Sequence, residues 1–234
     1  MISNQVHQHL EYHVKLSGKK ANPLSRKDLM IAIIDYQMGN LGAILNMLKK
    51  IGADAIVTRK VQEIEKAEKL IFPGVGAFDN GVTNLQTSGI LPALREKVLI
   101  QKIPVLGICL GMQLLTERSE EGILPGLGWI EAKTIRFRIH QKASNLKVPH
   151  MGWNTLILKR ESTLFKDFDE DGKFYFIHSY HILCNNHEDV LAETHHGYDF
   201  VSAVQKGNIF GVQFHPEKSH KYGMRILRNF AEIV

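Results

Sequence analysis

The sequence predicts an α/β fold in which a mostly parallel central sheet carries helices on both faces and continues into a mixed or antiparallel extension. In the first half of the chain, short β-branched runs alternate with segments of helical apolar spacing. In the second half, strand-like runs crowd together without helices between them. The chain has 234 residues, of which 44% are hydrophobic and 23% charged, so it is long enough to bury a core without disulfides.

The alternating elements begin near Met30. Residues 1–29 are polar and lack a sustained apolar period, so we expect a flexible, dispensable extension before a single domain over 30–234, with Met30 as a plausible alternative start. Buried parallel strands are predicted at 31–34, 55–58, 69–72 and 104–108. A helix between the first two is predicted from apolar residues at helical spacing, namely Leu41, Leu45, Leu48 and Ile51.

The second half, which follows the Gly/Pro-rich stretch 122–128, predicts the extension of the sheet. Strand-like runs occur at 129–138, 155–158, 174–178, 191–194, 200–205 and 209–214. Turn signals at 170–172 and 206–208 separate some of them, which favours antiparallel pairing. A final helix is predicted over 219–233.

Charge and cysteine content exclude several classes of protein. The formal net charge is +5, but residues 1–29 alone contribute +3, so the rest of the chain lacks the footprint of a nucleic-acid-binding domain. Two cysteines do not make a disulfide framework. Without a long apolar run or a signal peptide, we expect neither membrane insertion nor export, and we expect a cytoplasmic protein.

The segment Gly107-Ile-Cys-Leu-Gly111 contains the candidate nucleophile. It follows a strand-like run and precedes a helical pattern, which is the context of a nucleophile elbow. Glycines two residues before and after Cys109 would relieve crowding in this turn, and the N-terminus of the helix would stabilise a thiolate. Taken alone, the pattern favours a buried structural cysteine.

A candidate base and its orienting group follow a late strand, in Gly211-Val-Gln-Phe-His-Pro-Glu217. In extended chain, residues i and i+2 project to the same side, and we expect the intervening proline to keep the chain extended. Glu217 would then accept a hydrogen bond from His215, as in a Cys-His-Glu triad. A metal site is the alternative, but no second pair shows convincing ligand spacing, so we expect no metal.

The turn Pro73-Gly-Val-Gly76 is a candidate oxyanion-binding loop. It follows a predicted strand, and its glycines permit the Val75 N–H to point into a pocket beside the Leu110 N–H. It lacks the glycine pattern and the lysine of phosphate-binding loops. A plain tight turn is the alternative when the loop is considered alone.

Together these motifs resemble class I (triad) glutamine amidotransferases over residues 30–234. Within that family they are similar to the glutaminase subunits that serve imidazole glycerol phosphate synthases in histidine biosynthesis. The segments that carry the resemblance are Pro73-Gly-Val-Gly76, Gly107-Ile-Cys-Leu-Gly-Met-Gln113, Val148-Pro-His-Met-Gly-Trp-Asn154, His178-Ser-Tyr180 and Gly211-Val-Gln-Phe-His-Pro-Glu-Lys218.

The resemblance implies a flavodoxin-like fold, a Cys109-His215-Glu217 triad and no cofactor. Cys109 thiolate would attack the side-chain amide of L-glutamine, and His215 would protonate the departing ammonia. Water activated by His215 would then hydrolyse the glutamyl thioester. The resemblance also implies a glutamine site lined by Gly76, Gln113, Ser179 and Tyr180.

A partner is implied as well, because the chain has no length for an ammonia acceptor. The family uses a (β/α)₈ cyclase subunit as heterodimer partner, which receives channelled ammonia and makes imidazole glycerol phosphate and an aminoimidazole carboxamide ribotide. Positions that match this interface are Asn40, Trp153, Tyr180 and Lys218. Asn40 has an alternative role as a helix N-cap.

Some residues depart from this pattern and leave the acceptor pathway open. Gln37 replaces a usual glycine, and the segments 176–181 and 218–223 are similar to paralogues that supply ammonia to a sugar amidotransferase in surface-glycan synthesis.

A stand-alone cysteine hydrolase and a catalytically silent binding homologue are further alternatives. The segment His178-Ser-Tyr180 and the His-x-Glu motif argue against the first, and the intact triad argues against the second.

Overall fold

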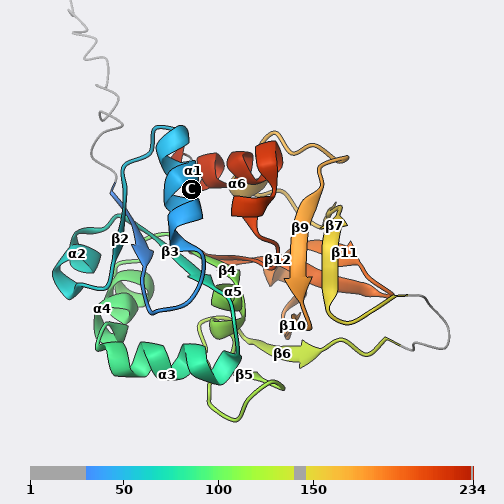
Figure 1. The fold of residues 1–234 in the computed structure, drawn as a ribbon, viewed down its shortest axis with the longest axis horizontal. Coiled ribbons are helices and arrows are strands. Elements are labelled where there is room, and N and C mark those ends of the chain that lie inside the picture. The colour runs from blue at the N-terminus through green and yellow to red at the C-terminus, as the bar shows by residue number, and fades with distance from the viewer. Residues whose placement is uncertain (1–29, 140–145, 233) are drawn as a thin grey trace, which may run out of the picture.

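The computed structural model describes residues 30–139, 146–232 and 234, so the predicted extension 1–29 lies outside the described residues. Its main sheet has the order β2-β1-β3-β4-β13-β12-β10-β6-β5, and β11 joins β12 and β8 (Figure 1). The first five strands in this order are parallel neighbours. They are β2 (Ala55–Thr58), β1 (Ile31–Ile34), β3 (Lys69–Gly74), β4 (Val105–Cys109) and β13 (Ile209–Val212).

Beyond β13 the sheet becomes mostly antiparallel, as predicted. The strands of this part are β12 (Asp199–Lys206), β10 (Tyr180–Cys184), β6 (Ala132–Arg136), β11 (Val190–His195) and β8 (Ile157–Leu158), with the short β5 (Arg118–Ser119) parallel to β6. A separate two-stranded ribbon pairs β7 (His150–Asn154) with β9 (Phe174–His178). The fold class predicted from the sequence is therefore confirmed.

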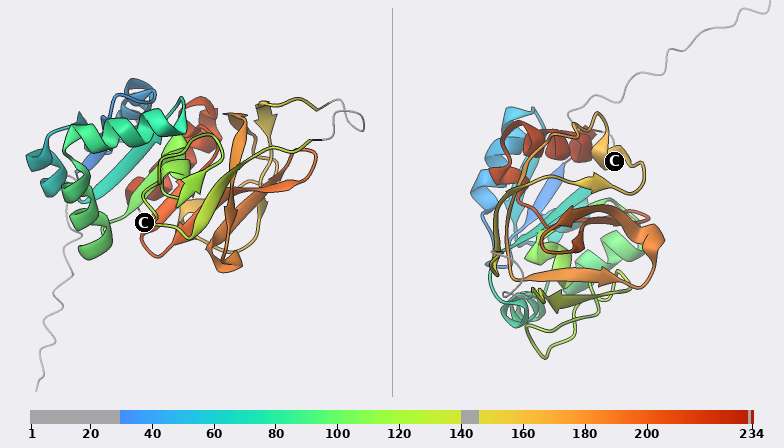
Figure 2. Two further views of the ribbon diagram at one scale, coloured as in Figure 1. Left: turned by 90° about the horizontal axis from the view of Figure 1, so that it is seen from below. Right: turned by 90° about the vertical axis from the view of Figure 1, so that its right-hand side faces the viewer.

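Helices cover both faces of the parallel strands (Figure 2). One face carries α1 (Leu41–Lys50) and α6 (His220–Glu232), together with the 3₁₀ turn η2 (Thr163–Phe165). The opposite face carries α2 (Val61–Lys66), α3 (Phe78–Ser88), α4 (Leu91–Arg95), the π-helical turn η1 (Glu96–Ile100) and α5 (Leu110–Leu114). Two further 3₁₀ turns are η3 (His187–Asp189) and η4 (Pro216–Lys218).

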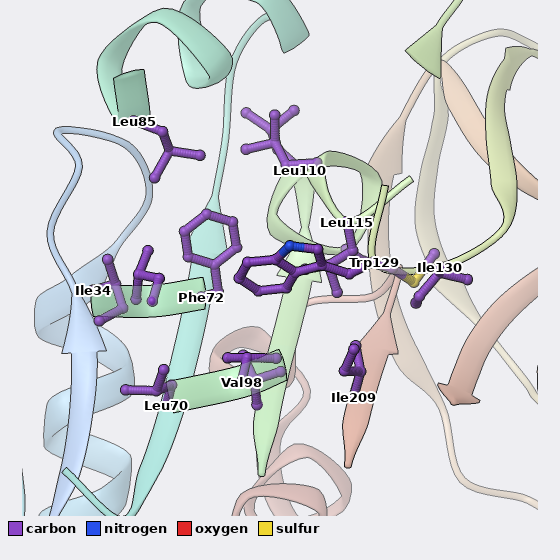
Figure 3. Packing of buried hydrophobic residues seen from close by; sticks show 14 of the residues in the cluster. Ile34, Leu70, Phe72, Leu85, Val98, Leu110, Leu115, Trp129, Ile130 and Ile209 are labelled. Carbon is purple, nitrogen blue, oxygen red and sulfur yellow. The ribbon is translucent and has the colours of Figure 1, made fainter. Parts of the chain in front are cut away.

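Alternation along the strands builds a core on each side of the sheet. Ile34 in β1 and Phe72 in β3 face the helices of one side, whereas Ile33 and Ile71 face the other. Figure 3 shows Ile34, Leu70 and Phe72 among side chains contributed by α3, α5 and the segment that contains Trp129. Both faces of these strands are thus buried, which explains why their sequences are continuous apolar runs.

The structure adds elements that the sequence pattern did not predict. Strands β5, β7 and β10 were not among the predicted elements. Helical segments were expected between the parallel strands, but without the bounds that the structure gives for α2, α3 and α4. The predicted final helix lies at His220–Glu232, and the predicted run 129–138 contains the shorter strand β6. In the part of the chain that is described, no helix combines the length and the apolar character needed to cross a membrane.

Two helical glycines test how tightly α5 packs on the sheet. A Cβ added at Gly111 in α5 would overlap the backbone carbonyl of Phe72, whereas a Cβ at the exposed Gly42 in α1 would meet nothing within 4 Å. We expect Gly111→Ala to lower the free energy of unfolding by about 1–3 kcal/mol, because backbone must shift. Gly42→Ala is expected to raise it by about 0.5–1 kcal/mol. Urea unfolding of both variants measures the difference, and equal effects would contradict this packing.

Candidate active site

Cys109 stands at the turn where β4 passes directly into α5. It is the last residue of the strand and the N-cap of the helix, with φ of 53° and ψ of −112°. A positive φ is costly for a residue with a Cβ, and such strain concentrates at functional sites. The thiol is nearly buried, at 6% exposure, and makes no disulfide. This geometry is that of a nucleophile elbow rather than of an ordinary core cysteine.

The glycines on either side of Cys109 allow this turn. A Cβ at Gly107 would lie 2.8 Å from the Met112 Cα, in the backbone of the helix that follows. Gly111 lies against the Phe72 carbonyl of the neighbouring strand, as described above. The crowding expected from the sequence is therefore present on both sides of the nucleophile.

His215 and Glu217 form a buried pair beyond the end of β13. His215 Nδ1 lies 2.8 Å from Glu217 Oε1, and the two side chains are 1% and 3% exposed. The expected contact is present, and His215 itself is extended, with φ of −100° and ψ of 98°. The expectation that the chain stays extended through Pro216 is wrong, because Pro216–Lys218 forms the 3₁₀ turn η4. Proline at the start of a helical turn costs no hydrogen bond, and the turn brings residue i+2 back toward His215.

The surroundings of His215 favour its charged form. Burial by itself lowers the pKa of this imidazole, but interactions with Cys109 and Glu217 and their negative charges outweigh burial and raise the pKa to about 10. His215 Nε2 has no conventional hydrogen-bond partner among the described residues, so it remains available to the Cys109 sulfur and to a reacting group. By contrast, burial together with the Asp189 charge raises the pKa of the second cysteine, Cys184, to about 12.

A pocket of about 500 Å³ opens onto Cys109. It brings together most of the residues singled out in the sequence, namely Val75, Gly76, Cys109, Leu110, Gln113, Ser179, Tyr180 and Lys218. Gly76 has φ of 116°, as expected for a loop that only glycine tolerates at this position. His215 and Glu217 are buried and are not among the lining residues of the pocket.

The remaining predicted residues lie outside the pocket. Asn40 caps α1 by accepting a hydrogen bond from the Ala43 N–H at 3.3 Å, which is the alternative considered for it. Trp153 is 46% exposed on β7 and stacks on His220. Within the described residues, no group of three or more His, Cys, Asp or Glu side chains is arranged to hold a metal ion.

Several residues of the site were not predicted from the sequence: Pro149, Ile177 and His178 line the pocket, and Glu121 and Gln213 contribute polar groups. Glu121 lines the pocket from a loop, and its Oε2 accepts a hydrogen bond from the Phe78 N–H at the start of α3. No local sequence pattern identifies Glu121 as a site residue. Gln213 is fully buried, and its Nε2 lies 3.6 Å from the Cys109 sulfur. Its position two residues before His215, within a recognised motif, is the signal that could have found it.

The sequence of the chain is similar to known glutamine amidotransferase proteins. The profile of the family Glutamine amidotransferase class-I matches residues 32–234. Imidazole glycerol phosphate synthase subunit HisH 2 of Methanococcus maripaludis is 53% identical over 201 residues, which cover 86% of this chain and 98% of that protein. The protein of the same name from Pseudomonas aeruginosa is 48% identical over 205 residues, which cover 88% of this chain and all of that protein.

Solved structures share the fold at low sequence identity. A glutamine amidotransferase structure superimposes with a TM-score of 0.63 at 21% identity, covering 84% of this chain and 98% of that one. The PurLQS structure from Thermotoga maritima gives 0.62 at 18% identity, covering 87% and 97%. At these identities the likeness concerns the fold alone.

The raised pKa of His215 has a consequence for stability. Because folding raises the pKa from 6.5 to about 10, His215 contributes stability that is fully present below about pH 6.5 and is lost as the pH rises toward 10. Removing the carboxylate in Glu217→Gln should reduce this contribution. We therefore expect the stability advantage of the wild type over Glu217→Gln to shrink between pH 7 and 10.5, as measured by urea unfolding. An advantage that grows with pH would contradict the charged imidazole.

Proposed function

The chain belongs to the class I glutamine amidotransferase family, and from this premise we propose that it is the glutaminase subunit of an imidazole glycerol phosphate synthase in histidine biosynthesis. One observation carries the proposal most directly. Cys109, held at positive φ, opens onto a pocket beside the buried His215–Glu217 pair. The enzyme class is glutamine amidotransferase, and the substrate is L-glutamine.

The reaction proceeds through a covalent intermediate on Cys109. The thiolate attacks the side-chain amide carbon of glutamine, and the imidazolium of His215 gives its proton to the departing ammonia. His215, now neutral, removes a proton from water, which hydrolyses the glutamyl thioester and releases glutamate. Glu217 holds the imidazole in place from Nδ1 and stabilises its charge, which leaves Nε2 for the proton transfers.

The pocket supplies the remaining groups for this chemistry. Leu110 begins the helix after the nucleophile, and Val75 follows a strand in the facing loop, so their N–H groups are the proposed oxyanion donors. Glu121 and Lys218 place opposite charges in the pocket wall. Glutamine carries an ammonium and a carboxylate on its α-carbon, so a wall with both charges suits this substrate.

The proposed partner is a cyclase subunit that takes up the ammonia. The relatives named above are subunits of a synthase, which favours this partner over the sugar amidotransferase considered from the sequence. Exposed apolar side chains lie on the ribbon next to the pocket, where Met151, Trp153 and Ile177 are 60%, 46% and 38% exposed. We propose that this ribbon contacts the cyclase, together with Lys218 and Tyr180 at the mouth of the pocket. Asn40 is the further interface residue proposed from the sequence.

Replacing Glu217 by glutamine tests the triad. The substitution keeps the shape of the side chain but removes the charge that stabilises the imidazolium, so we expect glutaminase kcat to fall at least about tenfold with a smaller change in KM. Glu188→Gln, an exposed carboxylate on η3, is the matched control and should keep full activity. Steady-state assays of glutamate release with the cyclase present measure both, and an unchanged kcat in Glu217→Gln would exclude the proposed role.

Replacing Cys109 by alanine tests the division of labour between the subunits. In the assembled complex, we expect Cys109→Ala to abolish synthesis from glutamine and to spare synthesis from added ammonium salt, because the cyclase needs only ammonia. Cys184→Ala removes the buried second thiol and should retain both activities. If Cys109→Ala lost both activities in an intact complex, the proposed function would be wrong.

A further inference from the structure

Two buried histidines lie side by side at the pocket, which His178 itself lines, and neither has a part in the reaction described above. His150 on β7 and His178 on β9 are register partners in the two-stranded ribbon, and they are 4% and 6% exposed. His150 Nδ1 lies 3.1 Å from His178 Nε2. Burial lowers the pKa of His150 to about 4 and that of His178 well below its usual value, so both rings are neutral at pH 7.

The hydrogen bonds at the two ends of this pair determine both tautomers. His178 Nδ1 lies 2.8 Å from the Tyr180 carbonyl, which only accepts, so Nδ1 must carry the hydrogen. Nε2 of the neutral ring is then an acceptor, and His150 must donate from its own Nδ1. His150 Nε2 accepts in turn from Asn154 Nδ2 at 3.3 Å. That nitrogen also donates to the His195 carbonyl, which confirms the orientation of the amide.

The same Tyr180 carbonyl accepts a second hydrogen bond, from the side chain of Gln113, which lies between Tyr180 and the residues around Cys109. Gln113 Nε2 donates to the carbonyl at 3.0 Å and also donates to Gln213 Oε1 at 3.0 Å. The Gln213 amide must therefore present its nitrogen to the Cys109 sulfur, 3.6 Å away. An N–H donor stabilises a sulfur anion, whereas the carbonyl of a flipped amide would oppose it. Two series of hydrogen bonds thus converge on the Tyr180 carbonyl. One comes from Asn154 through His150 and His178, and the other connects the carbonyl through Gln113 and Gln213 to Cys109.

Both amide hydrogens of Gln113 are used in these hydrogen bonds, one to the Tyr180 carbonyl and one to Gln213 Oε1. The oxygen Oε1 is consequently the amide atom left to face a substrate in the pocket that Gln113 lines. An acceptor at this place can bind an N–H donor of glutamine. The orientation of Gln113 therefore affects both the substrate and, through Gln213, the nucleophile.

We propose that His178, oriented by His150, is a positioning residue for the glutaminase reaction. It donates to the same Tyr180 carbonyl that accepts from Gln113, and so keeps the Gln113 and Gln213 amides in the orientation that catalysis needs. The inference rests on the proposed function, because it assigns a role in that reaction. The hydrogen bonds themselves do not depend on which partner receives the ammonia.

Two isosteric substitutions separate this role from a purely structural one. In His178→Asn, the amide nitrogen can take the place of Nδ1 and donate to Tyr180. In His178→Gln, the longer side chain places an amide at the position of Nε2, and the donor to Tyr180 is lost. With the cyclase present, we expect His178→Asn to keep kcat/KM within about threefold of the wild type, and His178→Gln to lose about tenfold or more, with KM for glutamine raised. Similar values in both variants would overturn the proposal.

Two measurements do not depend on glutaminase activity. Alkylation of Cys109 by iodoacetamide should be slowed in His178→Gln and restored in His178→Asn, with the buried Cys184 as internal reference. The ¹⁵N NMR spectrum of histidine-labelled wild type should show a protonated Nδ1 and an unprotonated Nε2 in both His150 and His178. A protonated Nε2 in His178 at neutral pH would overturn the proposal even if His178→Gln failed to fold. A protein with these tautomers but without glutaminase activity would instead contradict the proposed function.

Discussion

The close approach of α5 to β3 and β4 is the constraint on which the site depends. The helix begins at Leu110 without a connecting loop, so Cys109 must reverse the chain at a positive φ. This reversal needs backbone-to-backbone contact on both sides, against the Phe72 carbonyl at Gly111 and against Met112 at Gly107. The two apolar cores beneath and above the sheet hold the strands that impose this strain. The Cys109 sulfur is consequently fixed at the carboxyl end of the parallel strands, which is where open α/β sheets place their ligands.

Buried charge is the second constraint, and the fold concentrates it in one place. His215 and Glu217 are almost completely inaccessible, so each requires the other to compensate for lost hydration. The imidazolium and the carboxylate lie beside the cysteine and do not line the open pocket. The pocket wall instead consists of apolar and neutral polar residues together with the two charged side chains of Glu121 and Lys218. The proposed triad and the proposed substrate site are therefore formed by different side chains, and Cys109 is the residue that belongs to both.

Much of this arrangement could be predicted from local sequence patterns. Parallel strands buried on both faces read as continuous apolar runs, and the glycines around Cys109 reflect crowding between neighbouring elements, so both were predictable. Strands β7 and β10 were missed because their pairing is long-range, and β7 contains Gly152 and Trp153 in place of a regular alternation. The turn at Pro216 was misjudged as extended because the contact between His215 and Glu217 is compatible with two backbone conformations. Glu121 could not be found, since only the folded chain brings its loop to the pocket.

Covalent labelling with a glutamine analogue shows directly whether Cys109 is the nucleophile. A chloroketone analogue of glutamine carries an electrophilic carbon where the substrate has its amide, so it should alkylate the residue that attacks that amide. Peptide mass spectrometry of the labelled complex is expected to show one adduct, on Cys109, none on Cys184, and protection by excess glutamine. An unmodified Cys109, or an adduct on Cys184 that glutamine does not suppress, would contradict the assignment of the active site.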